Sequence, residues 1–255
     1  CNIHQHSVLV DYMVPKGSSF IGKHGSDFMP TNDLAWVGFS VETGPDGGVY
    51  ILDWHDQNIC GNVVKFANSA RVYRIMPKGV KPIKRFDLNK LSDEELTDMQ
   101  DHSNDWYVRQ ARTVLQYRAA SGKLNAAKVH GKLESMLKNA KTAGKRLRAL
   151  WALQVTGGFK GKDAKLMALL DDPEQYVRSW TIQFLSEDKK PSDALLTKFS
   201  KMAKSDSSPV VRLYLASALQ RFPHDKRWSI LEGLASHAED KDDNNIPRMV
   251  WLALE

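Results

Sequence analysis

Cysteine and long apolar runs are both scarce in this chain of 255 residues. Cys1 and Cys60 are its only cysteines, too few for a disulfide scaffold, and no Cys-x-x-Cys spacing indicates zinc or a redox dithiol. One Cys1–Cys60 bridge and two unpaired thiols are both compatible with the sequence. No run of about 18 apolar residues occurs, so we expect no membrane-spanning helix.

The first six residues also lack the marks of a translation start or an export signal. They contain no methionine, no basic segment and no apolar segment, so no signal peptide can be identified there. We therefore expect the chain to be a piece of a longer protein. Its composition, 42% hydrophobic and 26% charged, is typical of a globular protein.

The charges are unevenly divided along the chain. Residues 1–80 are close to neutral, whereas residues 81–255 hold the excess that gives a net charge of +6. Basic and acidic residues are interleaved there rather than gathered into a basic stripe. This pattern indicates a solvated surface and predicts no nucleic-acid partner.

The first 80 residues have the alternation and turn spacing of short antiparallel strands. We expect four strands and a looser fifth around Phe20, and residues 44–48 supply a glycine-rich connection between two of them. Four strands in this length correspond to about one blade of a β-propeller plus the edge of another. Residues 1–80 are therefore predicted to be the C-terminal part of a propeller. The expected strands lie near residues 8–14, 37–41, 49–54 and 71–75.

Residues 81–255 have the three- and four-residue apolar spacing of helices. Ser92 and Glu95 form a capping-box pattern at a helix start. Asp172 before Pro173 and Ser208 before Pro209 each predict an N-cap followed by proline at the first helical position. We expect the first helices of two helical pairs at residues 162–170 and 192–204.

A valine-arginine signature recurs within the expected second helices at Arg109, Arg178 and Arg212, and weaker copies occur around Arg148 and Arg248. Its arginines, separated by 39, 30, 34 and 36 residues, are Arg109, Arg148, Arg178, Arg212 and Arg248. Helical pairs of this period cannot bury their apolar faces alone and must stack, as in an α-solenoid. The fold class is therefore predicted to be mixed, β then α: a partial propeller followed by a solenoid over residues 81–255.

These repeats resemble HEAT repeats, in which an acidic residue precedes the valine-arginine pair. The resemblance implies that Asp172 with Arg178, Asp206 with Arg212 and Asp105 with Arg109 take part in structural ladders between neighbouring pairs. The second copy has Lys145 where the acidic residue is expected, so Arg148 departs from this pattern.

Residues suited to chemistry are concentrated in the strand region, near the end of the strand predicted at residues 49–54. The hypothesis for the site makes His55 and Asp56 catalytic proton-transfer groups and Asp53 a metal ligand. His4, His6 and Arg71 are the candidate cofactor-binding residues. The alternative is structural, because an aspartate at a strand end also forms turns and Trp54 also suits a blade core.

Several segments together resemble one family. Residues 44–56 (GPDGGVYILDWHD) and 71–75 (RVYRI) are similar to the closing propeller blade of membrane-bound dehydrogenases of the planctomycete and verrucomicrobial type. Residues 16–20 (KGSSF) and 27–29 (DFM) resemble the segments before that blade. Further matches downstream are residues 104–112 (NDWYVRQAR) and 244–251 (NNIPRMVW).

The resemblance implies an exported, periplasmic oxidoreductase. Its propeller would be similar to those of glucose- and sorbosone-type dehydrogenases that use pyrroloquinoline quinone, followed by HEAT-like repeats and a c-type haem domain. The implied partners of this chain are the remaining blades and that haem domain. The chain contains no Cys-x-x-Cys-His, so it cannot attach haem covalently.

Two functions are therefore expected. In the first, the chain is part of a dehydrogenase for a sugar-like or alcohol substrate, inactive alone, with its repeats acting as a scaffold. In the second, the chain is a non-enzymatic module that binds a protein or a glycan.

Overall fold

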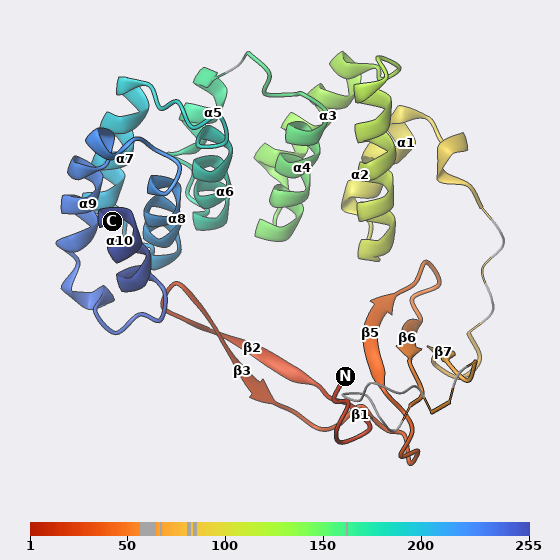
Figure 1. The fold of residues 1–255 in the computed structure, drawn as a ribbon. Helices are drawn as coiled ribbons and strands as arrows, with labels where there is room; N and C mark the ends of the chain where they lie inside the picture. Colours follow the sequence, from red (N-terminus) through yellow and green to blue (C-terminus); the bar gives the residue numbers. More distant parts are fainter. Residues whose placement is uncertain (57–64, 67, 81–82, 84–85, 162) are drawn as a thin grey trace. The chain divides into compact units, whose positions relative to one another are not determined.

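The computed structural model describes residues 1–56, 65–66, 68–80, 83, 86–161 and 163–255. Strands come first and helices follow, which confirms the predicted order (Figure 1). The contacts divide the chain into two compact units. The strand unit comprises residues 1–14 and 22–114, and the helix unit comprises residues 15–21 and 115–255. Among the described residues no helix has the length and apolar character needed to cross a bilayer.

The strands form small antiparallel sheets. One sheet has three strands in the order β5-β6-β7, and two ribbons pair β1 with β4 and β2 with β3. The structure thus shows a three-stranded sheet rather than a four-stranded blade. The strands are β1 (Ser7–Val8), β2 (Asp11–Lys16), β3 (Ser19–His24), β4 (Met29–Pro30), β5 (Gly38–Thr43), β6 (Val49–Asp53) and β7 (Arg71–Ile75).

One face of the three-stranded sheet carries a small core. Ile51 on β6 is fully buried and packs with Trp36 and Val8. The register pairs Ile51 with Tyr73 on β7, so both side chains lie on the same face. The next residue, Leu52, faces away from this core because side chains alternate along a strand. The sheet is therefore covered on one face by its own unit.

The turn between β5 and β6 is held by Asp46. Its carboxylate accepts the Gly48 amide at 2.9 Å and the Tyr50 hydroxyl at 2.8 Å. It also receives Arg74 of β7 at 2.7 Å. The Gly48 hydrogen bond and the contacts with Tyr50 and Arg74 lower the pKa of Asp46. Gly47 has φ +76°, a conformation that glycine adopts without strain.

The helices form a helical repeat region made of pairs. The α-helices are α1 (Asp93–Asp98), α2 (Asp105–Ala120), α3 (Ala126–Asn139), α4 (Ala143–Val155), α5 (Asp163–Leu169), α6 (Gln175–Leu185), α7 (Asp193–Ser205), α8 (Pro209–Leu219), α9 (Trp228–Ala235) and α10 (Ile246–Leu254). Short 3-10 helices are η1 (Leu88–Lys90), η2 (Met99–Asp101), η3 (His224–Lys226) and η4 (Ala238–Asp240).

Within the helix unit the pairs stack in two layers. The second helices α4, α6, α8 and α10 contact one another in succession, and α7 packs on α9 in the other layer (Figure 1). The core between them includes the fully buried side chains of Ile182, Phe199 and Leu215. Each pair thus covers the apolar face of the next, which is the arrangement that a repeat solenoid needs.

Two of the three predicted helix starts are confirmed. Ser92 accepts the Glu95 amide while Glu95 accepts the Ser92 amide, a complete capping box. Ser208 caps α8 with Pro209 in the first turn. Asp172 is not the N-cap of α6, because the helix starts at Gln175 and Glu174 takes that position. The Asp172 carboxylate instead accepts the Glu174 amide and is directed to a neighbouring helix pair.

The tip of the β2–β3 hairpin belongs to the helix unit and is held by Asp243, just before α10. The Asp243 carboxylate accepts the Ser18 amide and the Ser18 hydroxyl, each at 2.7 Å. Burial alone would raise the pKa of Asp243, but the hydrogen bonds from Ser18, Asn245 and Ile246 lower it to about 2. Gly17 has φ +55°, and a Cβ atom there would lie 2.2 Å from an Asp243 oxygen. Glycine is therefore required at this position.

Candidate functional site

The predicted site at the end of β6 is organised around Asp53, whose side chain is fully buried. One carboxylate oxygen accepts the amides of Val37 at 2.8 Å and His55 at 2.9 Å. The other oxygen accepts Arg71 Nε at 2.9 Å. Both oxygens are thus occupied by donors of this chain. Asp53 holds the end of the sheet together and does not fit the predicted role of metal ligand.

Arg71 connects Asp53 to Asp33, a residue that the sequence analysis did not single out. The guanidinium lies 2.7 Å from Asp33 and 2.8 Å from Asp53, so it bridges the two carboxylates. The Arg71 hydrogen bond and the Ala35 amide lower the pKa of Asp33. The guanidinium also lies over the Tyr73 ring, 5.4 Å from its centroid. Asp33 follows no strand signal and lies far from Arg71 in sequence, so only the fold reveals this contact.

His55 lies between Ser69 and Asp33. Its Nδ1 is 2.8 Å from the Ser69 hydroxyl and its Nε2 is 3.5 Å from Asp33. These are the residue types of a hydrolytic triad, but the contacts differ from one. The Ser69 hydroxyl donates to the Phe66 carbonyl at 2.6 Å, and Asp33 is already paired with Arg71. A serine in this state is not activated as a nucleophile.

The other predicted site residues have separate partners. Asp56 is buried and accepts the Lys65 amide at 2.9 Å. His6 is bound through Nδ1 to the Trp36 carbonyl at 2.8 Å, and His4 is exposed with its amide on Asn2. The structure therefore brings Asp53, His55 and Arg71 together, with His6 reaching the adjoining Trp36. It does not bring His4 into this cluster.

The cluster does not fit a redox cofactor or a metal ion. Its two carboxylates are held by Arg71 and by backbone amides, and the described residues contain no group of three or more side chains placed to hold a metal ion. Cys1 is exposed. Cys60 lies outside the described residues, so a bridge between Cys1 and Cys60 stays a prediction of the sequence. The geometry is that of a structural ion-pair cluster. Such clusters shift the pKa values of their members, as catalytic sites do, so the lowered pKa of Asp33 is no sign of catalysis.

The repeated arginines form a ladder between successive helix pairs. Arg178 of α6 makes two hydrogen bonds to Asp206, at 2.9 and 2.8 Å, and Arg212 of α8 makes two to Asp240, at 2.5 and 2.6 Å. Each guanidinium also donates to a carbonyl of its own pair, at Asp172 and Asp206 respectively. The aspartates thus join neighbouring pairs, which assigns these arginines to stacking.

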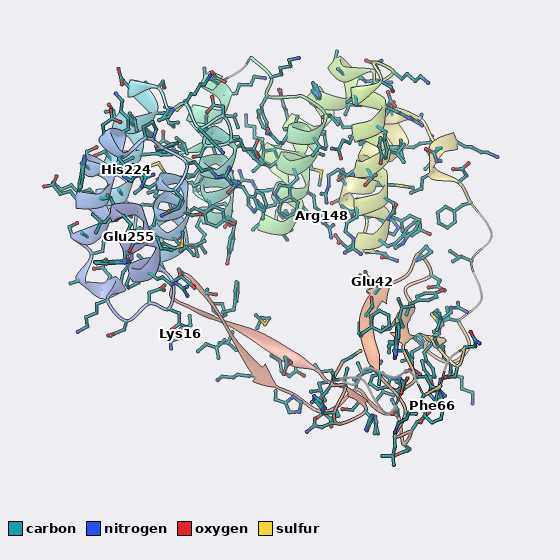
Figure 2. The ribbon with its side chains drawn as sticks, in the orientation of Figure 1. Lys16, Glu42, Phe66, Arg148, His224 and Glu255 are labelled. Carbon is teal, nitrogen blue, oxygen red and sulfur yellow. The ribbon has the colours of Figure 1, made fainter. Side chains whose placement is uncertain are left out.

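The same rung between the α3–α4 pair and the next pair is made by Arg146, not by Arg148. Arg146 donates to both carboxylate oxygens of Asp172, at 2.9 and 2.5 Å. Arg148 lies two residues further along α4 (Figure 2). Each rung joins an arginine to the aspartate of the following pair, so this rung needs no acidic residue before Arg148. Arg148 therefore does not occupy the predicted ladder position.

The outer two predicted rungs differ from the inner ones. Arg109 of α2 lies 3.6 Å from Asp105 on its own helix and 3.7 Å from Glu42 on β5, in partly exposed contacts. Asn104, just before α2, donates to the Gly44 carbonyl at 2.9 Å. Arg248 of α10 is exposed and has no ion pair with any residue that the structure describes. Among the described residues, neither arginine pairs with an aspartate of a following helix pair.

The outward face of the second helices carries a row of aromatic side chains. Trp151 of α4 meets Trp180 of α6 edge to face, with ring centroids 5.2 Å apart. Trp180 meets Tyr214 of α8 at 6.5 Å. Burial raises the pKa of the Tyr214 hydroxyl. These aromatic side chains are half-buried and available at the surface.

A groove of about 670 Å³ continues this row toward α10. Its apolar lining includes Leu213, Tyr214 and Met249, and its polar lining includes Gln183 and Arg248. We call the outward face of α4, α6, α8 and α10, together with this groove, the second-helix face. It combines apolar area with a few convergent polar groups, as binding sites do.

Comparison with known proteins identifies no family: no family model and no curated protein matches this chain. Among solved structures, a designed armadillo repeat protein in complex with the peptide (KR)4 matches 66% of this chain and 87% of its own chain. The identity is 14% and the TM-score is 0.37. A TM-score this low does not establish a shared fold. The description of the helical repeat region is therefore based on the contacts between helices given above.

Proposed function

We propose that this chain is a segment of an exported, periplasmic dehydrogenase of the family it resembles, joining the last part of a propeller to a helical scaffold. The observation that supports this is the outer face of the β5–β7 sheet. Leu52 and Val72 form a register pair on that face, and they are 40% and 66% exposed. Phe39, at an irregularity in β5, is 60% exposed. Apolar pairs on both faces of a sheet are expected where another sheet packs on it.

In this proposal the redox chemistry belongs to other parts of the protein. The carboxylates of Asp53 and Asp33 are paired within the chain, so they stabilise the sheet, and among the described residues of this cluster none is left to hold a quinone or a metal. Pyrroloquinoline quinone would be held by the remaining blades, and a c-type haem by the domain after the repeats. The helix pairs would act as a spacer between them, with the Arg–Asp ladder making the stack stiff.

The experiment compares Val72→Asp in the isolated chain and in a longer protein with the neighbouring blades. In the isolated chain Val72 is exposed, so we expect less than about 0.5 kcal/mol of destabilisation. In the longer protein a buried aspartate without a partner should cost about 2 kcal/mol or more. The control is the same change at an exposed position, Lys78→Asp, which should have a small effect in both proteins. An equally small effect of Val72→Asp in both proteins would contradict the proposed packing.

Activity provides the second arm. The longer protein should oxidise a sugar or an alcohol with pyrroloquinoline quinone and reduce its c-type haem, seen as the haem absorption bands. A protein without haem that oxidises none of these substrates would favour the alternative, a non-enzymatic module that binds a protein or a glycan. The aromatic row Trp151–Trp180–Tyr214 is the observation that favours this alternative.

A further inference from the structure

The strand unit contains a pocket of about 480 Å³ beside the turn between β5 and β6, where α2 begins. We call it the α2 pocket. Small-molecule sites enclose about 300 to 1,000 Å³, so this pocket has room for a small ligand. The residues of the Asp53 cluster do not line it. Its lining includes Glu42 and Thr43 of β5, Tyr50 of β6, and Trp106, Arg109 and Gln110 of α2.

The walls of the α2 pocket are fixed by hydrogen bonds within the chain. The Asn104 side chain donates to the Gly44 carbonyl at 2.9 Å, which ties the turn to the start of α2. The Asn104 side-chain oxygen accepts the Trp106 amide, also at 2.9 Å. On the strand side, the Tyr50 hydroxyl is held by Asp46 at 2.8 Å. A ligand therefore enters walls that are already ordered, which reduces the entropy cost of binding.

The polar side chains of the α2 pocket are open to a ligand. Glu42 and Arg109 have exposed fractions of 67% and 48%, and the guanidinium lies 3.7 Å from the carboxylate, longer than a hydrogen bond. The side chains of Thr43 and Gln110 and the indole N–H of Trp106 make no hydrogen bond within the described part of the chain. The pocket thus offers acceptors, donors and groups that do both.

These groups indicate the chemistry of the ligand. The lining contains one carboxylate and one guanidinium, so its charges balance and favour an uncharged ligand. Sugar hydroxyls both donate and accept, so a sugar can bond to Glu42 and Arg109 at the same time. The half-buried indole of Trp106 supplies an apolar surface for the C–H groups of a sugar ring. Phe86 and Tyr107 meet this indole edge to face, with ring centroids at 5.7 and 5.1 Å, and hold its orientation.

We propose that the α2 pocket binds a neutral saccharide, with one sugar ring against Trp106 and hydroxyl groups bonded to Arg109 and Gln110. Glu42 accepts a further hydroxyl from the side of β5. The site binds its ligand without a chemical step. It lies apart from the redox chemistry assigned to other parts of the protein, so it goes beyond the proposed dehydrogenase function and does not depend on it.

The first test measures the binding of neutral sugars to the full chain. The probes are the methyl glycosides of glucose, galactose, mannose and xylose, titrated by saturation-transfer difference NMR. Ligands of this size bind with Kd values of about 1 mM, and we expect saturable binding of at least one probe. Because the probe is uncharged, its affinity should stay the same when salt is raised. Binding of none of the four, or an affinity that falls with salt, would overturn the proposal.

Matched variants locate the site. Gln110→Ala removes a hydrogen-bond partner from the pocket and should weaken the bound probe by about fivefold. Gln116→Ala makes the same change on the same helix, at an exposed position outside the pocket, and should leave the affinity unchanged. Trp106→Ala removes the apolar surface and should weaken binding by at least about tenfold.

Circular dichroism melts verify that the variants remain folded, and the two glutamine variants decide the outcome if Trp106→Ala unfolds. Equal affinities of Gln110→Ala and Gln116→Ala would place the sugar elsewhere and refute the assigned site.

Discussion

The Arg212–Asp240 rung offers a quantitative test of how the helix pairs are joined. The exposed fraction is 3% for the Arg212 side chain and 8% for Asp240, and two hydrogen bonds at 2.5 and 2.6 Å link them. The hydrogen bond to Asp240 raises the pKa of Arg212. Asp240→Asn keeps the shape of the side chain but removes its charge, leaving the guanidinium buried with weaker partners. Removing one member of a buried ion pair costs about 3 to 5 kcal/mol.

We expect the lower end of that range, about 3 kcal/mol, because Arg212 retains the Asp206 carbonyl at 2.8 Å and Glu239 at 3.6 Å. Urea unfolding followed by circular dichroism measures the difference, and the melting temperature should fall by about 6 to 12 °C. Asp171→Asn is the matched control. Asp171 pairs with Lys198 but is 73% exposed, so its loss should cost at most about 1 kcal/mol. Equal effects of the two substitutions would refute the structural role of the ladder.

Two further predictions concern the other charged contacts. The pKa of Asp243 is about 2 in the folded chain against 3.8 normally, so its stabilising contribution is present above pH 4 and is lost as the pH falls toward 2. The stability difference between the wild type and Asp243→Asn should therefore shrink over that interval in urea titrations. A constant difference would argue against a stabilising role of the Ser18–Asp243 hydrogen bonds. Arg71→Ala leaves the buried Asp53 carboxylate without its cation and should destabilise the strand unit by about 2 to 3 kcal/mol. Hydrogen exchange of the β6 amides measures this loss, and Arg109→Ala, which removes only contacts of 3.6 to 3.7 Å, should cost less than about 1 kcal/mol in the same measurement.

Local signals in the sequence predict the helix starts that depend on neighbouring residues. The Ser92 capping box and the Ser208–Pro209 start each need only a few adjacent side chains, and both are present. The Asp172–Pro173 pattern is the same at the sequence level, yet α6 begins later. The Asp172 carboxylate binds Arg146 of the preceding pair. This contact between neighbouring pairs, which local sequence does not show, accounts for the N-cap of α6 being Glu174 and not Asp172.

The candidate site shows the same division between local and long-range information. The concentration of acidic residues and histidine after β6 is visible in the sequence, but their role depends on Asp33 and Ser69, which arrive from distant segments. Those partners make Asp53 and Arg71 part of a structural ion-pair cluster. Likewise, the aromatic row needs the stacking of three helices before Trp151, Trp180 and Tyr214 come together.

In the proposed function, the β5–β7 sheet is an incomplete part of a larger sheet assembly, and the stack of helices that follows it is stable by itself. Hydrogen exchange followed by mass spectrometry tests this directly, by comparing the isolated chain with a longer protein that supplies the neighbouring blades. We predict that protection of β5 and β7, the two edge strands, rises in the longer protein while protection of α6 and α8 stays unchanged. Identical protection of β5 and β7 in both proteins would contradict the proposal that neighbouring blades pair with this sheet.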